Sequence, residues 1–409
     1  MSSDAYTGKL KHIFDRSAKK KPRQADSQPD LPPWDDEDNG GPSSLSAFQQ
    51  HQVFFDLDSS FVDLSTIRIW LTICDDGHAR CTDYAKFGFP PTWLIDVEDE
   101  CIVSPTQIPG EGRYCALSYV WGQTRTSKLT TATRPAFRRP GAFSADSGVF
   151  LPKTIRHAIG LVKALGERYL WVDALCIVQD EGELSELGNM GAIYARAYLT
   201  IVAATGWDAD EGLWGLRGIS RPRHIAENFG DDLQKYIDPD SMIWSSRGWT
   251  LQEKEFSRRM IMFCDQTVIW KCLCLCMDES GAELATQSAH GTALAHVNLL
   301  LRSEEILPDA DPFALFAELT HTIISPYNSR SFTHTSDLPR AFAGIAQALT
   351  QTAAPRTPFR QGFCWGLPVA HLPYALTWCA AEENLRPRDR ALGFPSWSWM
   401  AWEGSVSSE

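Results

Sequence analysis

The sequence predicts an α/β fold with a parallel β-sheet core flanked by helices, and three observations predict it. Three apolar runs, residues 114–121, 169–178 and 199–206, have the length and composition of buried strands. The segments between them, 151–166 and 183–198, repeat apolar residues at helical spacing. Successive strands joined by helices form right-handed crossovers and therefore lie parallel. We expect the downstream ends of the three strands to share one rim of the sheet.

The composition indicates a globular, acidic protein. Its 409 residues are 44% hydrophobic and 11% aromatic, which is enough for one or two large cores. The formal net charge of -13 argues against nucleic acid as a partner, because phosphate contacts need a concentrated basic surface. No apolar run is long enough for a membrane-spanning helix. We therefore expect no nucleic acid and no membrane span, and a small-molecule partner; self-association or a protein partner stays open.

The N-terminus and the cysteines indicate the compartment. Eleven cysteines lack a framework spacing and the first residues lack a signal peptide's apolar core, so we expect a reducing, cytoplasmic location with buried free thiols. Residues 1–45 combine a basic block with an acidic Pro/Gly/Ser stretch and predict a disordered arm. The basic block KKKPR at 19–23 leaves nuclear import open.

Order is expected to begin near residues 48–58 and certainly by 66–74, where branched and aromatic residues reach the density of a strand. Cys74, His78 and Cys81 follow with the spacing of half a zinc site. A closed site needs four ligands, and no second pair follows at a suitable distance. We therefore predict a packed turn and no metal, although metal binding by these three residues stays open.

The two helices between the strands follow from their apolar stripes. Segment 151–166 accepts Pro152 in its first turn and ends at Gly166. Segment 183–198 is predicted as one further helix. The stripe of the first comprises Leu151, Ile155, Ala158, Ile159, Val162 and Leu165, and that of the second Leu184, Leu187, Ile193, Tyr194 and Ala197.

Beyond the third strand the pattern predicts a short helix at 245–259 and then a hairpin of residues 260–264 and 267–276. Alternation along the second hairpin strand puts Cys272, Cys274 and Cys276 on one face. Thiols on one straight strand diverge, so core packing is predicted for them.

The remaining chain divides the protein into three parts. Residues 277–310 are a polar connector, and the segments after it predict a mainly helical region packed on the first domain. We predict a disordered arm over 1–45, a domain over 46–276 with its core at 111–276, and a mainly helical C-terminal region over 277–409.

Several blocks resemble the fungal heterokaryon-incompatibility (HET) domain family. They occur in the family's order, and similar segments of the C-terminal region extend the resemblance over roughly residues 65–404. The blocks are YCALSYVWG at 114–122, LPKTI at 151–155, YLWVDALCIVQD at 169–180, MGAIYARA at 190–197 and RGWTLQE at 247–253.

The resemblance implies an effector that triggers cell death when incompatible fungi fuse, on a scaffold remotely like TIR domains and therefore flavodoxin-like. Some TIR domains cleave NAD with a glutamate in a tryptophan-bearing helix start, and SRGWTLQE is similar to that segment. The resemblance implies that Glu253 takes the glutamate's position and that NAD is a substrate. The sequence has no GxGxxG loop, so a dinucleotide would be held in another way.

Polar residues at the strand ends are the candidate site, because ligands of open parallel sheets bind beyond the carboxyl ends of the strands. Glu253 and Asp173 are the candidate catalytic residues, with Asp173 inside the second predicted strand. A carboxylate beside the ribose stabilises the positive charge that grows as nicotinamide departs. The candidate ligand-binding residues are Ser118, Trp121, Gly122, Gln179, Asp180, Arg247 and Trp249.

Structural roles compete with these assignments. Asp173 could cap a helix or pair with Arg168 or Arg196, and Glu253 could complement a helix dipole. Asp180 could cap a helix N-terminus, and Trp249 could belong to the core.

Two other functions stay open. The short architecture and its many aromatic residues fit a secondary-metabolite cyclase or pericyclase, such as a Diels–Alderase, that folds a terpenoid or polyketide in an apolar pocket. The other is a non-catalytic interaction module. The substrate, the activating signal and the oligomeric state are not determined by the sequence.

Overall fold

The computed structural model describes residues 60–82, 88–108, 112–180, 185–223, 242–265, 267–279, 281, 284, 312–352, 358–381 and 385–408. The predicted arm at 1–45, the segment at 48–58 and most of the connector at 277–310 lie outside these ranges. Within them, no helix has the length and apolar character needed to cross a membrane.

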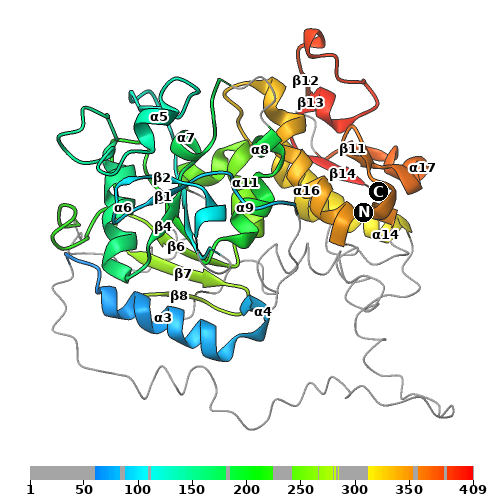
Figure 1. Cartoon of the computed structure of the whole chain (residues 1–409). Helices are drawn as coiled ribbons and strands as arrows, with labels where there is room; N and C mark the ends of the chain where they lie inside the picture. The colour runs from blue at the N-terminus through cyan, green and yellow to red at the C-terminus, as the bar shows by residue number, and fades with distance from the viewer. Residues whose placement is uncertain are drawn as a thin grey trace, which may run out of the picture.

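The described core is one eight-stranded sheet with the order β2-β1-β4-β3-β5-β6-β7-β8 (Figure 1). Its four central strands, β4, β3, β5 and β6, are parallel, and antiparallel pairs continue the sheet on both sides. The strands are β1 Leu94–Asp96, β2 Cys101–Val103, β3 Cys115–Ser118, β4 Tyr169–Trp171, β5 Leu199–Ala203, β6 Arg259–Phe263, β7 Val268–Cys272 and β8 Cys276–Asp278.

The order of the parallel strands confirms the predicted α/β fold. Numbered along the chain, they lie in the order 2-1-3-4, which is the flavodoxin-like arrangement. In this arrangement the strand order reverses between β3 and β5, and ligands bind beyond the carboxyl ends of the strands at that point. Ser118, the last residue of β3, lies opposite Val202 of β5 there.

Helices cover both faces of the sheet. The chain moves along the sheet in one direction from β3 to β4 and in the other from β4 to β5 and β6. Right-handed crossovers therefore place α6 (Lys153–Leu165) on one face and α9 (Met190–Arg196) and α11 (Gly248–Phe256) on the other. In Figure 1, α6 lies at the left and α9 and α11 at the right. The predicted helix at 151–166 is confirmed, and Gly166 ends it with φ 83°.

The strand predicted at 66–74 is wrong, because this segment is helical. Helix α3 (Leu64–Gly77) buries Ile67, Trp70, Leu71 and Cys74, which recur every three or four residues. The carboxylate of Asp63 caps it by accepting from the Ser65 backbone N–H at 2.8 Å. The density of branched and aromatic residues indicated a strand, but their spacing is that of a helix. The short helix α4 (Ala79–Thr82) follows.

Two further predicted elements are shorter than expected. The strand predicted at 169–178 ends after Trp171, and Asp173 opens the short helix α7 (Asp173–Cys176) instead of lying inside a strand. The helix predicted at 183–198 is interrupted at Asn189, between α8 (Ser185–Gly188) and α9. The side chain of Asn189 accepts from the Phe89 N–H at 3.1 Å and donates to the Phe89 carbonyl at 2.7 Å. These bonds tie the interruption to a neighbouring loop.

The hairpin predicted after residue 259 is confirmed, but its cysteines do not share one strand. Strand β7 ends at Cys272, and the chain turns before Cys276 opens β8. The backbone N–H of Cys272 donates to the Leu275 carbonyl at 2.8 Å, which closes this turn. The three thiols therefore have different environments: Cys272 is buried, Cys274 exposed and Cys276 intermediate.

The described C-terminal region contains helices and short strand pairs, and the domain boundaries stay a prediction. Its longest helix, α16, contacts α8, α9 and α11. The helices are α14 Pro312–Leu319, the π-helix η4 Thr320–Ile324, α15 Ser325–Asn328, α16 Leu338–Thr352 and α17 Leu372–Ala375. The strands are β9 Phe363–Cys364, β10 Leu367–Pro368, β11 Trp378–Ala380, β12 Arg386–Pro387, β13 Trp402–Glu403 and β14 Val406–Ser408.

The remaining regular elements are single turns that connect the larger ones. They comprise helix α5 Arg134–Phe137 and the 3₁₀ turns η1 Pro105–Gln107, η3 Ile243–Ser246, η5 Thr335–Asp337, η6 Pro358–Gln361, η7 Val369–His371, η8 Arg390–Leu392 and η9 Trp399–Ala401.

Candidate active site at the carboxyl ends of the parallel strands

The centre of the candidate site is a hydrogen bond between Ser118 and Glu253. The Ser118 hydroxyl, at the carboxyl end of β3, donates to the Glu253 carboxylate. The same hydroxyl oxygen accepts from the Trp244 indole Nε1 at 2.6 Å. Ser118 is 1% exposed, Trp244 0% and Glu253 6%. The structure thus brings together Ser118, a predicted ligand-binding residue, and Glu253, a predicted catalytic residue, in a buried hydrogen-bond network.

Helix α11 holds Glu253 in place by bonds at its own backbone. The Glu253 carbonyl accepts from the Ser257 hydroxyl at 2.6 Å, and Ser257 bonds to Thr200 of β5 at 2.7 Å. At the other end of α11, the Thr250 hydroxyl donates to the Trp244 carbonyl at 2.7 Å. These contacts fix α11 against β5 at one end and against η3 at the other.

Burial changes the acidity of Glu253. It raises the pKa of the carboxyl from 4.5 to about 7, and the charge of Asp173 acts in the same direction. The hydrogen bond from Ser118 and the charge of Arg247 act against this rise. A carboxyl with a pKa near neutrality changes its protonation state in the range in which general acids and bases work.

Two buried tyrosines, Tyr194 and Tyr119, lie close to the candidate carboxyls. The Tyr194 hydroxyl, on α9, donates to the Leu117 carbonyl of β3 at 3.0 Å. Burial, with the charge of Glu253 next, raises the pKa of Tyr194 well above 10. Burial, with the charge of Asp173 next, does the same for Tyr119. Both phenols therefore stay neutral and act as hydrogen-bonding groups.

The second candidate carboxylate, Asp173, is half-buried at the first position of α7. Its Oδ2 accepts from the Trp121 indole Nε1 at 2.6 Å, and its Oδ1 accepts from the Ala174 backbone N–H at 2.7 Å. Burial raises the pKa of Asp173, against hydrogen bonds from Trp121, Ala174 and Tyr119. The ion pair weighed for it with Arg168 is not formed, because Arg168 pairs with Asp96, Glu98 and Asp99.

Gly122 has a backbone role. Its φ is 61°, and a Cβ at this position would meet the Asp208 side chain at 2.3 Å and the Asp208 Cα at 2.7 Å. The carboxylate of Asp208 accepts from the backbone N–H groups of Gln123 and Thr124 at 2.8 and 3.0 Å. A tight turn thus follows β3, with Trp121 half-buried at its start.

Gln179 and Asp180 lie near the rim but are engaged in loop contacts. The Gln179 amide donates to the carbonyls of Asp173 and Ile177 at 3.2 and 3.1 Å, which closes the end of α7. The exposed Asp180 accepts from the Thr131 N–H and hydroxyl at 2.8 and 2.6 Å. These bonds lower the pKa of Asp180.

Arg247 and Trp249 are half-buried at the start of α11. The charge of Arg247 lowers the pKa of both Glu253 and Asp173, so its guanidinium is close enough to influence the two carboxyls. The ring of Trp249 packs against the hydrophobic core. Arg247 therefore belongs to the cluster, whereas Trp249 supports it.

Sequence reasoning missed three members of this cluster: Tyr119, Tyr194 and Trp244. Tyr119 directly follows Ser118, so its place in the first apolar run is the signal that could have found it. Tyr194 was assigned to the apolar stripe of a helix, and its hydroxyl was not considered. Nothing in the sequence around Trp244 connects it with Ser118.

Residues 114–253 match the family model described as Heterokaryon incompatibility protein (HET). The matched segment begins just before β3 and ends at Glu253 within α11, so it includes the strand ends and the cluster around them. The resemblance predicted from the sequence is confirmed over this segment. Comparisons with curated proteins and with solved structures find no match to this chain.

Proposed function

Since residues 114–253 are a domain of the heterokaryon-incompatibility family, we propose that the protein is an incompatibility effector that cleaves the bond between nicotinamide and ribose in NAD. The observation that carries the proposal is the position of Glu253. Its carboxyl is bonded to Ser118 at the point where the order of the parallel strands reverses, and its pKa is about 7. Open parallel sheets bind nucleotides at that point.

The reaction requires one carboxylate beside the ribose. The C1′–N1 bond breaks and nicotinamide leaves with the electron pair, while positive charge develops on C1′ and the ring oxygen. An ionised Glu253 next to this carbon stabilises that charge. A water oxygen then bonds to C1′, and its proton is released to solvent. Ser118 holds the carboxylate in one orientation by its hydrogen bond.

The other charged and aromatic residues of the rim fit a dinucleotide. Arg247 offers a planar guanidinium suited to a phosphate. The half-buried Trp121 offers a ring whose indole N–H is already bonded to Asp173, so its orientation is defined. In this proposal Asp173 orients Trp121 and adds a second negative charge near the developing cation.

The charge of this cluster favours NAD over an apolar metabolite. A pocket that folds a terpenoid or polyketide needs an apolar lining with few polar groups. Here Glu253, Asp173 and Arg247 are close enough for each to shift the ionisation of a neighbour. Burial of ionisable groups lowers the stability of a folded protein. Such groups are therefore typical of sites that bind a charged substrate or transition state.

The test measures, by chromatography, the release of nicotinamide from NAD by the purified full chain. We expect turnover by the wild type and at least a ~100-fold loss in Glu253→Gln, as for removal of an electrostatic catalytic group. Glu255→Gln is the matched control, because Glu255 is another buried carboxylate of α11 at 2% exposure. It should retain turnover in proportion to its folded fraction.

Two outcomes would contradict the proposal. Wild-type protein that binds NAD without releasing nicotinamide would favour a non-catalytic module, and equal turnover by the wild type and Glu253→Gln would remove the catalytic role of the glutamate. Expression in a fungal host provides the cellular counterpart. NAD content and viability should fall with the wild type and with Glu255→Gln, but not with Glu253→Gln.

A further inference from the structure

Four potential metal ligands from distant parts of the chain meet beside the sheet. The side-chain ligand atoms of Cys74, His78, Cys81 and Cys272 all lie within 4.8 Å of one another. The first three form the C-x₃-H-x₂-C pattern in which sequence reasoning found no fourth partner. The fold supplies Cys272 at the end of β7, 191 residues after Cys81. The expectation that no further ligand follows at a suitable distance was therefore wrong.

Each ligand is positioned by a regular element. Cys74 lies in the last turn of α3, His78 is the residue that ends this helix, and Cys81 lies in α4. All four side chains are buried, with exposures of 0%, 8%, 0% and 3% along the chain. The Cys272 Sγ and the His78 Nδ1 are 3.5 Å apart. In a tetrahedral zinc site, bond lengths of about 2.3 Å to sulfur and about 2.0 Å to nitrogen give nearly this separation.

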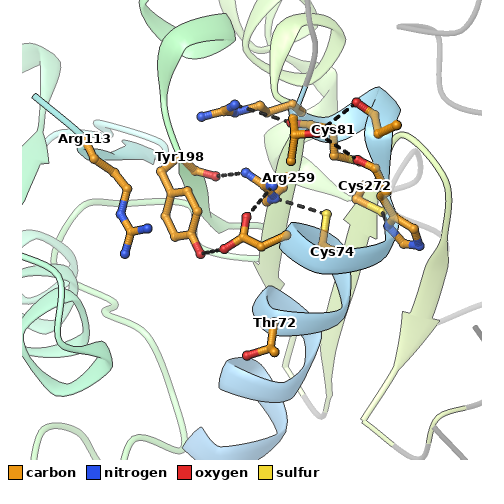
Figure 2. Close-up of polar contacts among 12 residues, drawn as sticks. Thr72, Cys74, Cys81, Arg113, Tyr198, Arg259 and Cys272 are labelled. Atoms are coloured by element: carbon orange, nitrogen blue, oxygen red, sulfur yellow. Dashed lines mark hydrogen bonds and ion pairs between the residues drawn. The ribbon is translucent and has the colours of Figure 1, made fainter. Parts of the chain in front are cut away.

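The thiols also receive hydrogen bonds suited to thiolates. The backbone N–H groups of Cys274 and Leu275 donate to the Cys272 Sγ at 3.4 and 3.3 Å, so the turn after β7 wraps around this sulfur. The Arg259 Nε donates to the Cys74 Sγ at 3.0 Å (Figure 2). Donors that surround the ligand sulfurs orient them and stabilise their charged form.

Arg259 is itself held in place. Its Nη2 donates to the Asp75 carboxylate at 2.6 Å, and the Tyr198 hydroxyl donates to the same carboxylate at 2.6 Å. The Arg259 side chain is 1% exposed and lies between Cys74 and Tyr198 in Figure 2. The guanidinium thus bonds to both the Cys74 sulfur and the Asp75 carboxylate, and these two bonds hold it beside the proposed ligand.

We propose that Cys74, His78, Cys81 and Cys272 bind one zinc ion in a structural site. Three thiolates and one imidazole are ligands that zinc prefers, and four protein ligands leave no open coordination position for a substrate. The burial of all four side chains fits a structural role for the ion.

The site links the segment that precedes the matched residues to the segment that follows them. Three ligands precede residue 114 and the fourth follows residue 253, so every ligand lies outside the segment that matches the family model. The ion links α3 and α4 to the end of β7, close to one edge of the sheet. It stabilises the folded state in the manner of a crosslink, since the unfolded chain has no preformed site.

The first experiment counts the metal. The full chain is expressed with added zinc, purified without chelators, and analysed by mass spectrometry for metals. We expect about one zinc per chain in the wild type, as for a closed four-ligand site, and a loss of most of it in Cys272→Ser. Cys264→Ser is the matched control, because Cys264 is another buried cysteine, next to β6 and outside the four. It should retain the zinc.

The second experiment needs no variant, in case Cys272→Ser fails to fold. Wild-type protein is loaded with Co²⁺, and its absorption is recorded. Intense tetrahedral ligand-field bands with thiolate-to-cobalt charge transfer support the proposal, and removal of the zinc by a chelator should lower Tm in a way that added Zn²⁺ reverses. Wild-type protein that carries no zinc and shows only weak octahedral cobalt bands would overturn it. So would a Cys272→Ser variant with the wild-type zinc content.

Discussion

The hydroxyl of Ser118 donates a hydrogen bond to the carboxylate of Glu253, although 135 residues separate the two in the chain. Ser118 ends β3 and Glu253 lies in α11, so this bond joins the carboxyl end of the sheet to a helix that follows the last of the three predicted strands. Burial raises the pKa of Glu253, and the Ser118 bond acts against this rise. The Ser118 bond thus favours the ionised form of the candidate catalytic group, against the effect of burial.

The rate of nicotinamide release should rise with pH through about 7, because ionised Glu253 is the active form in the proposed mechanism and its pKa is about 7. The measurement is kcat across the range from about pH 5 to about pH 9, at saturating NAD. A rate that falls as pH rises through 7 would mean that the protonated carboxyl acts instead, as a general acid.

Replacement of Glu253 by glutamine should remove a pH-dependent cost to stability. The pKa of 4.5 rises to about 7 on folding, so the folded protein holds this proton more tightly than the unfolded chain. The wild type therefore loses stability as pH rises from about 4.5 to about 7, by up to about 3 kcal/mol. The variant lacks this loss.

Urea unfolding of the wild type and Glu253→Gln at several pH values measures the effect. The free energy of unfolding of the variant, relative to that of the wild type, should increase with pH up to about pH 7 and stay constant above it. A difference that is independent of pH would contradict the raised pKa.

Ser118→Ala should cost about 1–3 kcal/mol, because it leaves the buried Trp244 indole N–H without its acceptor and removes one hydrogen-bond donor from Glu253. It should also raise the pKa of Glu253 further, since the Ser118 bond lowers it in the wild type. The rate–pH curve of the variant should therefore move to higher pH. A lower rate with an unchanged dependence on pH would mean that Ser118 has a structural role but does not affect the pKa of Glu253.

Gly122→Ala should destabilise the turn after β3 more than Gly141→Ala. Both glycines have positive φ values, 61° and 77°, so alanine strains the backbone at each. A Cβ at Gly122 would also meet Asp208 at 2.3 Å, whereas nothing lies within 4 Å of one at Gly141. Urea unfolding should show a loss of about 1 kcal/mol for Gly141→Ala and a clearly larger loss for Gly122→Ala. Equal losses would contradict the close approach of Asp208.

Gly248→Ala should weaken the contact between α11 and the C-terminal region. A Cβ there would meet the Phe332 ring at 2.0 Å, and the Gly248 N–H donates to the Ser331 carbonyl at 2.9 Å. Gly188→Ala is the control, since nothing lies within 4 Å of its Cβ and alanine favours helix. Limited proteolysis and Tm should report a loss of ~2 kcal/mol or more for Gly248→Ala only, the size of an overpacked core site. Resistance equal to the wild type would contradict the packing of the two parts.

The sequence alone determined the parallel core. The strands that contain Leu117, Leu170 and Ile201 are largely buried, and the amphipathic segment at 151–166 forms the crossover between the first two. Such patterns are local, because a strand or helix must bury its apolar side wherever it packs. The strand end at Ser118 followed from the same logic, whereas Asp173 was expected inside the second strand.

Local pattern was insufficient where composition and spacing pointed to different structures. Branched and aromatic residues at 66–74 indicated a strand, but the spacing of Ile67, Trp70 and Cys74 buries one side of a helix. The strand predicted at 169–178 ended early because the chain turns into α7 at Asp173, whose carboxylate accepts from the Ala174 N–H. In both segments the side-chain contacts decided the backbone.

Only the tertiary structure decided which distant groups meet. Trp244 reaches Ser118 across 126 residues, and Cys272 reaches His78 across 194. The positions of these partners depend on strand order and on the turn after β7, which no spacing in the sequence encodes. Hydrophobic periodicity specifies each element by itself, whereas convergence of polar atoms requires all of the elements to be packed.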